Sequence, residues 1–520
     1  MAFYLTQSLH RSLQQRPNEV ATVFGKRRQT WAQFGDRVAR AAGALRALGV
    51  KPDDRVALMA LNSDRYLEYY LATWWAGAVV NPVNVRWSPA EVAYSLDDCD
   101  TAVLIVDDTF KAMAADLRAR SKALRTVIHV GDGDPPEGML SWERIVAAAA
   151  PVADAHRSGE DLAGIFYTGG TTGFPKGVML THTNLASNAL GDVADGLVAP
   201  ERPALVAAPM FHLAAGALMM CNLIVGNTFV IVPAFTPAGV LEAIQSERVK
   251  SALLVPTMIQ MVIDFPGFKD YDTSSLTDVA YGASPISEDV MKRALAALPN
   301  ARFTQAYGMT EVSPCATFLK PWYHTAEGQK AGKLRSAGRA MTACEVRIVD
   351  PQDNEVPRGT VGEICVRGPG VMKGYWNKPE LTAQALRGGW MHTGDAGRMD
   401  DDGFVFIVDR VKDMIVTGGE NVYSVEVENA LSQHPAVAVA SVIGIPDDKW
   451  GEAVHAVVVL KPGQSVTKEA LIAHTHTLIA NYKCPRSVEF RDALPLTGAG
   501  KVQKTELRKP FWEGRDRNVA

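Results

Sequence analysis

Apolar residues recur along the chain in two alternating patterns, one typical of helices and one typical of strands. Residues 31–48 place apolar side chains at spacings of three and four, and Thr30 with Gln33 matches a capping box at the start of this pattern. Short, continuously apolar runs at 55–60 and 102–106 are typical of buried strands. Similar runs return in the middle of the chain, at 204–207, 228–232 and 252–255. The alternation predicts mostly parallel sheets covered by helices, because parallel strands need helical crossovers and are buried on both faces.

The pattern changes after about residue 340. Short β patterns separated by Asp, Gly and Pro turns follow, at 345–350, 363–367 and 404–408. The C-terminal part then shows its own helix and two apolar strands, at 424–432, 438–443 and 454–460. We therefore predict an α/β protein with a large N-terminal domain of residues 1–409, which includes a β-rich subdomain at about 340–409, and a small, mobile α+β C-terminal domain of residues 410–520.

The composition limits the class of protein. The chain has 520 residues, of which 47% are hydrophobic and 21% are charged, and this excludes a disordered, collagen-like or coiled-coil chain. Lys and Arg number 53 against 57 Asp and Glu, so the net charge of −4 provides no basic field for nucleic acid. An anionic ligand must therefore be bound by a local group of donors.

Cysteine usage and the lack of targeting patterns indicate a cytoplasmic protein. The six cysteines are scattered, with no CxxC and no Cys/His cluster in the sequence, so free thiols in a reducing compartment are expected. The N-terminus lacks a basic segment followed by an apolar one, which argues against a secretory signal. The most apolar stretch, 213–225, is shorter than the roughly 20 residues of a transmembrane helix. The oligomeric state is left open, with a homodimer as one option.

A loop rich in glycine and threonine follows the apolar strand pattern at 162–166, and it reads Tyr167-Thr-Gly-Gly-Thr-Thr-Gly-Phe-Pro-Lys-Gly177. Glycines allow backbone N–H groups to approach an anion, the hydroxyls add donors, and Lys176 adds charge, so the pattern is typical of a phosphate-binding loop. The alternative is a flexible surface loop. A Walker-type loop is excluded, because Pro175 precedes Lys176 and Gly177 follows it. The candidate phosphate-binding residues are Thr168, Gly169, Gly170, Thr171, Thr172, Gly173 and Lys176.

Further motifs follow this loop in order. They are Gln305-Ala-Tyr-Gly-Met-Thr-Glu311, His392-Thr-Gly-Asp395, Asp409-Arg-Val-Lys-Asp-Met-Ile415 with Gly418-Gly-Glu-Asn421, and Pro495-Leu-Thr-Gly-Ala-Gly-Lys501. On these motifs, nearly the whole chain resembles the adenylate-forming enzymes, which include acyl-CoA synthetases, firefly luciferase and the adenylation domains of peptide synthetases. One departure is Gly169, where the family usually has Ser, so one hydroxyl donor to phosphate is missing.

The resemblance implies an ATP-dependent carboxylic acid–CoA ligase. ATP and the acid would form an acyl adenylate with release of pyrophosphate, a step that needs Mg²⁺ and fixed cationic donors, and the thiol of coenzyme A would then displace AMP. A medium- or long-chain fatty acid is the favoured substrate, and an aryl acid of the feruloyl or cinnamoyl type is the alternative. Small residues at 214–217 fit either a wide apolar acyl pocket or close helix packing. An adenylation enzyme that loads a carrier protein and a non-catalytic nucleotide-binding relative are the other options.

The family motifs imply roles for individual residues of the large domain. Tyr307 would stack on adenine, Thr310 would contact the α-phosphate, and Glu311 would hold Mg²⁺ with help from the Thr168 hydroxyl. The alternative for Tyr307 is a core tyrosine. Taken without the other motifs, the Thr-Glu pair is equally a plain helix start. His212 would lie near the acyl pocket and the thiol route, although a lone histidine beside apolar residues is more often structural. The other nucleotide-binding candidates are Gly282, Ala283, Ser284, Gln305, Ala306 and Gly308.

The remaining implied roles fall on the C-terminal motifs. Asp395 would accept hydrogen bonds from the ribose hydroxyls and Arg410 would bind the ribose and phosphate side, although a turn aspartate and a solvated charged run at 409–413 are the plain alternatives. Lys501 would reach the carboxylate and α-phosphate oxygens during adenylation. Lys412 would be the hinge whose rotation withdraws Lys501 and admits the thiol. The segment that this rotation would bring to the site comprises Gly418, Gly419 and Glu420.

Overall fold

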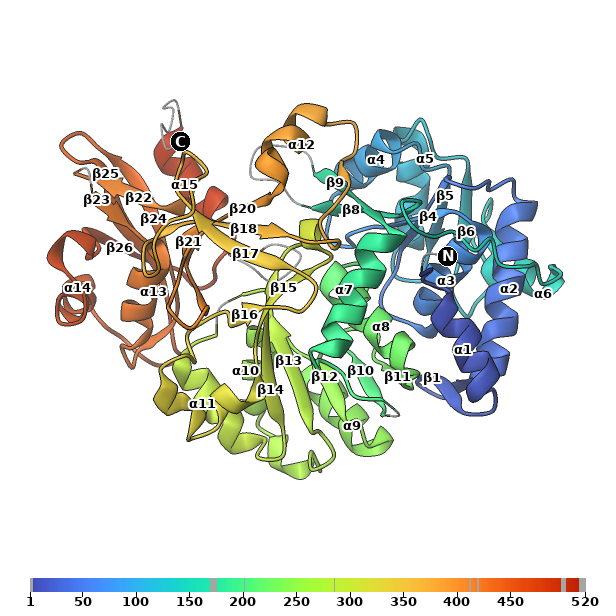
Figure 1. The fold of residues 1–520 in the computed structure, drawn as a ribbon, viewed down its shortest axis with the longest axis horizontal. Helices are drawn as coiled ribbons and strands as arrows, with labels where there is room; N and C mark the ends of the chain where they lie inside the picture. Colours follow the sequence, from blue (N-terminus) through green and yellow to red (C-terminus); the bar gives the residue numbers. More distant parts are fainter. Residues whose placement is uncertain are drawn as a thin grey trace. The chain divides into compact units, whose positions relative to one another are not determined.

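The chain forms two compact units (Figure 1). The computed structural model describes residues 3–168, 175–200, 202–284, 286–410, 413–418, 420–496 and 502–513. The first unit comprises residues 1–346 and 366–391, and the second comprises 347–365 and 392–520. The prediction of a mixed α/β fold with a large N-terminal part and a smaller C-terminal part is confirmed. The domain boundary between 409 and 410 stays a prediction.

The first unit contains a large sheet that is parallel at its centre. Its strands are β1 (Val20–Phe24), β2 (Arg27–Thr30), β10 (Ala204–Val206), β11 (Phe229–Ile231), β12 (Ser251–Leu253), β13 (Asp278–Gly282), β14 (Arg302–Gly308), β15 (Cys315–Leu319) and β16 (Arg339–Ala340). Their order is β16-β15-β14-β13-β12-β10-β11-β1-β2, and the strands from β14 to β1 are parallel. The apolar runs predicted in the middle of the chain form β10, β11 and β12, so the prediction of parallel strands is confirmed there.

A second sheet of the same unit carries the predicted phosphate-binding loop at one edge. Its strands are β3 (Arg55–Met59), β4 (Val79–Pro82), β5 (Val103–Val106), β6 (Thr126–His129), β7 (Leu140–Ser141), β8 (Leu162–Thr168), β9 (Lys176–Thr181) and β19 (Gly374–Tyr375). Their order is β19-β9-β8-β4-β3-β5-β6-β7. The strands from β8 to β7 are parallel, whereas β9 and β19 complete the edge in antiparallel pairs.

Helices cover both sheets and close their apolar cores. They are α1 (Gln7–Gln15), α2 (Trp31–Ala47), α3 (Asp64–Ala76), α4 (Pro89–Asp98), α5 (Ala114–Arg120), α6 (Trp142–Ala148), α7 (His182–Ala194), α8 (Leu213–Val225), α9 (Pro237–Glu247), α10 (Pro256–Ile263), α11 (Glu288–Ala297) and α12 (Pro379–Ala385). The predicted capping box is confirmed, since Gln33 N donates to Thr30 Oγ1 over 3.3 Å at the start of α2. One core joins α9, α10 and α11 to the first sheet, and another joins α4 and α5 to the second.

The second unit holds most of a small antiparallel sheet together with an α+β region. The small sheet has the order β17-β18-β20-β21 and consists of β17 (Glu345–Val349), β18 (Gly362–Arg367), β20 (Met391–Met399) and β21 (Val405–Arg410). The other elements are β22 (Ile415–Thr417), β23 (Glu420–Val422), α13 (Ser424–Ser432), β24 (Val437–Asp447), β25 (Gly451–Leu460), α14 (Lys468–His476), β26 (Ser487–Phe490) and α15 (Lys504–Trp512). β21 runs past its predicted end at 408, because Asp409 and Arg410 continue the ladder with β20.

Two general expectations can be compared with the fold. All six cysteines are free thiols, and all except Cys344 are buried. Within the described ranges, none of the helices combines the length and the apolar character that a membrane crossing requires. The apolar stretch at 213–225 forms the buried helix α8, which packs against α7.

Asp192 of α7 has a buried carboxyl group that accepts few hydrogen bonds. Its side chain is inaccessible to solvent, and Cys221 Sγ donates to Oδ2 over 3.5 Å. Among the described residues, Asp192 Oδ1 has no hydrogen-bond partner. Burial, which outweighs the hydrogen bonds from the neighbouring thiols, raises the pKa of Asp192 to about 7. Charging this carboxyl near neutral pH therefore destabilises the folded state.

We expect Asp192→Asn to raise the melting temperature more at pH 8 than at pH 5. The folded-state pKa lies above the ordinary value of 3.8, so the stability contributed by the neutral carboxyl is complete below that value and is lost as the pH rises through about 7. Between pH 5 and 7 the loss is on the order of 2–3 kcal/mol. Thermal unfolding of both proteins at the two pH values measures it, and an effect of equal size at both would contradict the buried-carboxyl explanation.

Candidate active site

Most of the predicted site residues of the first unit lie where neighbouring parallel strands finish, at the carboxyl-terminal end of the first sheet. His212 follows β10, residues 282–284 lie at and just after the end of β13, and 308–311 follow from the end of β14. Within β13 and β14, Gly282 lies opposite Ala306. Ligands of open α/β sheets bind at the carboxyl-terminal ends of the strands, because the loops that leave the strands there form a crevice.

At this end of the sheet, two glycines lie very close to the backbone of a neighbouring segment. A Cβ atom on Gly282 would lie 2.1 Å from the carbonyl oxygen of Ala306, and one on Gly308 would lie 1.9 Å from the carbonyl oxygen of Pro314. Both positions therefore require glycine for packing. Ala283, which follows Gly282, adopts a left-handed conformation with φ of 65°. A non-glycine residue held in this region stores strain, a feature that clusters at functional sites.

Contacts among three side chains connect the end of β14 to Lys176, which follows the predicted phosphate-binding loop. Glu311 lies in a short 3₁₀ turn, Thr310–Val312, and is 95% buried, with 5% of its surface exposed. The Tyr375 hydroxyl donates a 2.8 Å hydrogen bond to Glu311 Oε1. Lys176 Nζ lies 4.4 Å from the centre of the Tyr375 ring, a cation–π contact. Burial, with the nearby Glu311 carboxylate, raises the pKa of Tyr375, so its hydroxyl remains a donor.

Tyr375 was not among the predicted site residues. It lies on β19, which pairs with β9 so that Tyr375 is opposite Val178. This pairing joins parts of the chain about two hundred residues apart, and no spacing in the sequence reveals it. A tyrosine in a turn-rich segment carries no signal of its own, so this contact could be found only from the fold.

The loop itself is bounded by two predicted residues that lie opposite each other. Thr168 ends β8 and Lys176 begins β9, and the two are paired in the antiparallel register. The other predicted loop residues, Gly169, Gly170, Thr171, Thr172 and Gly173, lie outside the described residues. The described ends nevertheless place the start and the finish of the loop next to each other.

In the second unit, Asp395 and Arg410 lie side by side. They are opposite each other on β20 and β21, and Arg410 Nε is 3.0 Å from Asp395 Oδ1. The Asp395 side chain is 10% exposed, whereas that of Arg410 is 44% exposed. Lys412, Gly419 and Lys501 lie outside the described residues. Of the segment expected to move with them, Gly418 and Glu420 are described, and both are exposed.

The charged run at 409–413 is more than a solvated face. Asp409 is 3% exposed, and its carboxylate accepts hydrogen bonds from the backbone N–H groups of Arg410 and Ser424. Burial raises the pKa of Asp409, against the opposing effect of the Lys504 ammonium. The solvated-face alternative is therefore wrong for Asp409, because β21 carries this residue into the packed base of α13.

Glu363 holds the turn that carries Asp395. Its Oε2 lies 2.9 Å from His392 Nδ1, and its Oε1 accepts a 2.9 Å hydrogen bond from Gly394 N. Thr393 Oγ1 donates to the carbonyl oxygen of Ile364 and accepts from Asp395 N. Glu363 was missed from sequence, since nothing in the chain marks it as a neighbour of the 392–395 motif. The pairing of β18 with β20 brings the two together.

The same pairing forms a Cys/His contact that the sequence did not reveal. Cys365 Sγ lies 3.3 Å from His392 Nδ1, and both residues are buried. The sequence spacing shows no Cys/His cluster, because Cys365 and His392 meet only through the pairing of neighbouring strands. Cys365 is a free thiol, as expected from the sequence.

His212 is the N-cap residue of α8, at the end of the segment that connects β10 to this helix. Its ring lies against that of Phe211, with ring centres 4.4 Å apart. In the helix that follows, a Cβ atom on Gly216 would lie 3.7 Å from Tyr70 Oη, which is ordinary van der Waals contact. Close packing therefore does not require glycine at position 216, and both explanations for the small residues at 214–217 stay predictions.

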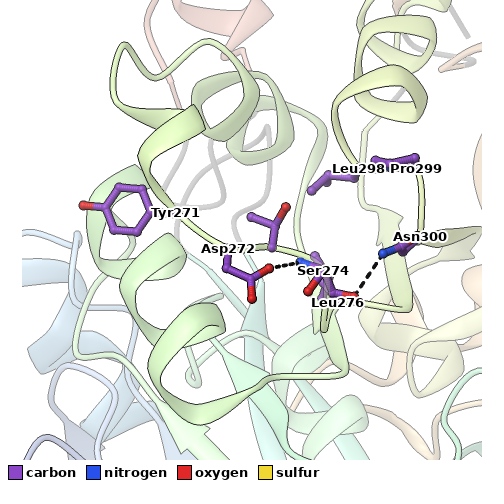
Figure 2. Close-up of a pocket in the computed structure, with 8 residues that line it drawn as sticks. Tyr271, Asp272, Ser274, Leu276, Leu298, Pro299 and Asn300 are labelled. Carbon is purple, nitrogen blue, oxygen red and sulfur yellow. Dashed lines mark hydrogen bonds between the residues drawn. The ribbon is translucent and has the colours of Figure 1, made fainter.

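The cavity in Figure 2 lies away from these residues. It has a volume of about 250 Å³ and is lined by Tyr271, Asp272, Thr273, Ser274, Leu276, Leu298, Pro299 and Asn300. These residues precede β13 and β14 in the chain, so they lie at the amino ends of the strands. The predicted site residues lie at the carboxyl ends, and the cavity is therefore not the candidate active site.

Comparisons with known proteins agree on one family. The AMP-binding enzyme family matches residues 9–376, and the AMP-binding enzyme C-terminal domain matches residues 426–501. A feruloyl-CoA synthase from an Amycolatopsis species is 41% identical over 500 residues, covering 95% of this chain and 96% of that protein. The medium/long-chain-fatty-acid–CoA ligase FadD8 from Mycobacterium tuberculosis is 36% identical, covering 98% of this chain and 90% of that protein. The crystal structure of ATP-bound MatB from Rhodopseudomonas palustris aligns with a TM-score of 0.89 at 32% identity, covering 98% of this chain and 99% of that one.

The fold, the strand-end residues and these matches define an AMP-forming acid–thiol ligase. The chain belongs to the AMP-binding enzyme family, the adenylate-forming enzymes that its motifs resemble. The family prediction made from the motifs is confirmed.

Proposed function

We propose that the protein couples the cleavage of ATP to AMP and pyrophosphate to the joining of an apolar carboxylic acid to coenzyme A. The contacts among Glu311, Tyr375 and Lys176 support this most directly. They connect a carboxylate, which is a common metal ligand, to the predicted phosphate-binding loop. It lies beside the strand ends at which a nucleotide of this family is expected. The proposal covers the substrates and the role of each residue.

The reaction balances without a protein nucleophile. A carboxylate oxygen of the acid attacks the α-phosphorus of ATP, the bond from that phosphorus to the bridging oxygen breaks, and pyrophosphate leaves. The thiol sulfur of coenzyme A then attacks the acyl carbon, AMP leaves with the oxygen, and the thiol proton is released. The first step brings together two anions, so fixed positive charge accelerates it.

Glu311 fits the proposed role of a Mg²⁺ ligand. Its Oε1 accepts a hydrogen bond from the Tyr375 hydroxyl, so Oε2 would be the oxygen that binds the ion. Hard divalent cations prefer such carboxylate oxygens, and a bound Mg²⁺ would neutralise charge on the phosphates. The Thr168 hydroxyl and the Lys176 ammonium would complete the phosphate side. Thr310, next to Glu311, would contact the α-phosphate.

The remaining residues divide between binding the nucleotide and binding the acid. Tyr307, which is 8% exposed, and the backbone around Gly282 would enclose the adenine. Asp395, oriented by Arg410 and by the turn that Glu363 holds, would accept from the ribose hydroxyls. Lys501 would balance the charge of the reacting oxygens in the adenylation step, and His212 would lie on the acid and thiol side.

Two acids are candidate substrates. An aryl acid of the feruloyl type is our first candidate, because the feruloyl-CoA synthase is 41% identical, against 36% for the fatty-acid ligase. A medium- or long-chain fatty acid, favoured by the sequence, remains the second candidate because FadD8 covers nearly the whole chain.

A panel of acids tests the function and the substrate together. Pyrophosphate exchange into ATP is measured with ferulate, cinnamate, octanoate and palmitate, and product formation is then measured with coenzyme A. We expect exchange and acyl-CoA formation with at least one acid, and the ratio of kcat/KM between aryl and fatty acids identifies the substrate class. Exchange without thioester would favour an enzyme that loads a carrier protein. No exchange with any acid would favour a non-catalytic relative.

Glu363→Gln is expected to raise KM for ATP about tenfold while leaving KM for the acid unchanged. The variant removes the charge that accepts from both His392 and Gly394, so the turn that carries Asp395 loses its anchor. Losing a charge-assisted hydrogen bond costs about 1.5–3 kcal/mol. Pyrophosphate-exchange kinetics at varied ATP give the result. Glu345→Gln, on the neighbouring strand β17 with a side chain 64% exposed, is the matched control and is expected to change neither constant.

A further inference from the structure

A cluster of two histidines and an aspartate lies in the first unit, on segments that the proposed reaction does not use. His10 lies on α1, while Asp154 and His156 lie in the stretch that precedes β8. His10 Nε2 is 2.8 Å from Asp154 Oδ2, and His156 Nδ1 is 3.6 Å from the same oxygen. One ligand atom from each residue lies within 4.8 Å of the other two.

The residue types suit a transition-metal ion, and the two distances of 2.8 and 3.6 Å lie on either side of the spacing between ligand atoms that such an ion requires. Imidazole nitrogen and carboxylate oxygen bind zinc at about 2.0–2.2 Å, so ligand atoms around one ion lie roughly 3–3.5 Å apart. Two histidines and one carboxylate also form the facial set that leaves further positions open on Fe, Co or Zn. Binding requires His10 to carry its proton on Nδ1, so that the ion takes the place of the proton between Nε2 and the carboxylate.

The carboxylate is held in place by groups that do not bind the ion. Asp154 has a side chain only 1% exposed, Thr6 Oγ1 donates to its Oδ2 over 2.6 Å, and His156 N donates to its Oδ1 over 3.0 Å. Such outer contacts orient the ligands of protein metal sites.

The histidines are oriented and reachable. The His10 ring stacks on Trp75, with ring centres 4.6 Å apart and planes at 27°. The side chains of His10 and His156 are 33% and 57% exposed, so an ion can enter from solvent and complete its coordination with water. A purely structural pair would need only His10 and Asp154. His156 packs edge-on against Tyr4, with ring centres 5.0 Å apart, and it also adds a second imidazole nitrogen 3.6 Å from the same oxygen.

We propose that His10, Asp154 and His156 bind one divalent transition-metal ion of the zinc and cobalt class, which ties α1 to the segment that leads into β8. The site is separate from the residues of the proposed reaction. An ion there would cross-link two stretches about 145 residues apart and stabilise the folded first unit.

His156→Asn is the variant that tests the site. His156 adopts a left-handed conformation with φ of 52°, which asparagine tolerates, so the substitution removes the imidazole without forcing a backbone change. The full chain, without a histidine tag and stripped with chelator, is titrated with Zn²⁺ by calorimetry and with Co²⁺ by visible absorption. His434→Asn, which removes an imidazole from the second unit, is the matched control.

The wild-type chain and His434→Asn are expected to bind one tight equivalent of Zn²⁺ and to gain melting temperature on adding it. His156→Asn is expected to lose at least tenfold in affinity for that equivalent and to lose the gain in melting temperature, with its unliganded melting temperature unchanged. Equal binding by all three chains, or no tight equivalent in the wild type, would overturn the proposal.

Discussion

Glu311→Gln is expected to slow acyl-adenylate formation on the order of 10²–10³-fold, the effect of removing one preorganised electrostatic group. The carboxylate is nearly buried and one of its oxygens accepts from the Tyr375 hydroxyl, so under the proposed function the other oxygen would bind the Mg²⁺ ion. Glutamine keeps the shape and the hydrogen bond but removes the charge. Pyrophosphate exchange across a range of Mg²⁺ concentrations measures the loss.

Tyr375→Phe separates the charge of Glu311 from its orientation. The variant keeps the ring under Lys176 Nζ and removes only the hydroxyl that donates to Glu311. We expect about a tenfold loss of exchange activity, in line with one lost hydrogen bond to a charged group, and a higher Mg²⁺ requirement. Glu380→Gln, at an exposed position of α12, is the control and should behave as wild type. Full activity of Glu311→Gln at low Mg²⁺ would remove the glutamate from the mechanism.

Lys501→Ala is expected to lower the rate of adenylation by a similar factor, on the order of 10²–10³-fold, while coenzyme A still attacks a pre-made acyl adenylate. Under the proposed function, the lysine charge is needed only while the acid carboxylate meets the phosphates, because the adenylate has already lost pyrophosphate in the second step. The two half-reactions are measured separately, by pyrophosphate exchange and by thioester formation from synthetic acyl adenylate. Equal loss in both would refute a role confined to the first step.

Lys412→Pro is the counterpart that should spare the first half-reaction. Proline fixes its own φ and restricts the residue before it, so a rotation at this position becomes costly. Adenylation should persist while thioester formation fails. Lys412→Ala, which removes the side chain and leaves the backbone free to rotate, is the matched control and should retain both half-reactions.

Local patterns predicted the elements that position the site. Parallel strands were predicted from short apolar runs, and such strands necessarily bring their carboxyl ends to one edge, which is where His212, Gly282 and Glu311 are found. The capping box at Thr30 and Gln33 was equally readable, because it depends on residues three apart. The order of the motifs identified the family for the same reason, since each motif is contiguous.

Contacts between distant strands could not be predicted in this way. Tyr375 reaches Glu311 only because β19 adds to the edge of β9, and Glu363 reaches the turn before Asp395 only because β18 pairs with β20. Neither residue belongs to a sequence motif that indicates a chemical function. The interpretation of residues 409–413 as a solvated charged run was also wrong at Asp409, since the ladder of β21 extends two residues beyond its apolar part.

The phenol of Tyr375 bridges two sites that ligands would occupy together. Its ring supports the ammonium at the mouth of the loop, and its hydroxyl fixes the carboxylate on the neighbouring sheet. A phosphate that draws Lys176 away from the ring changes the environment of that hydroxyl, and a cation on Glu311 does so from the opposite side. Thermodynamic linkage then requires each ligand to alter the affinity for the other by the same factor.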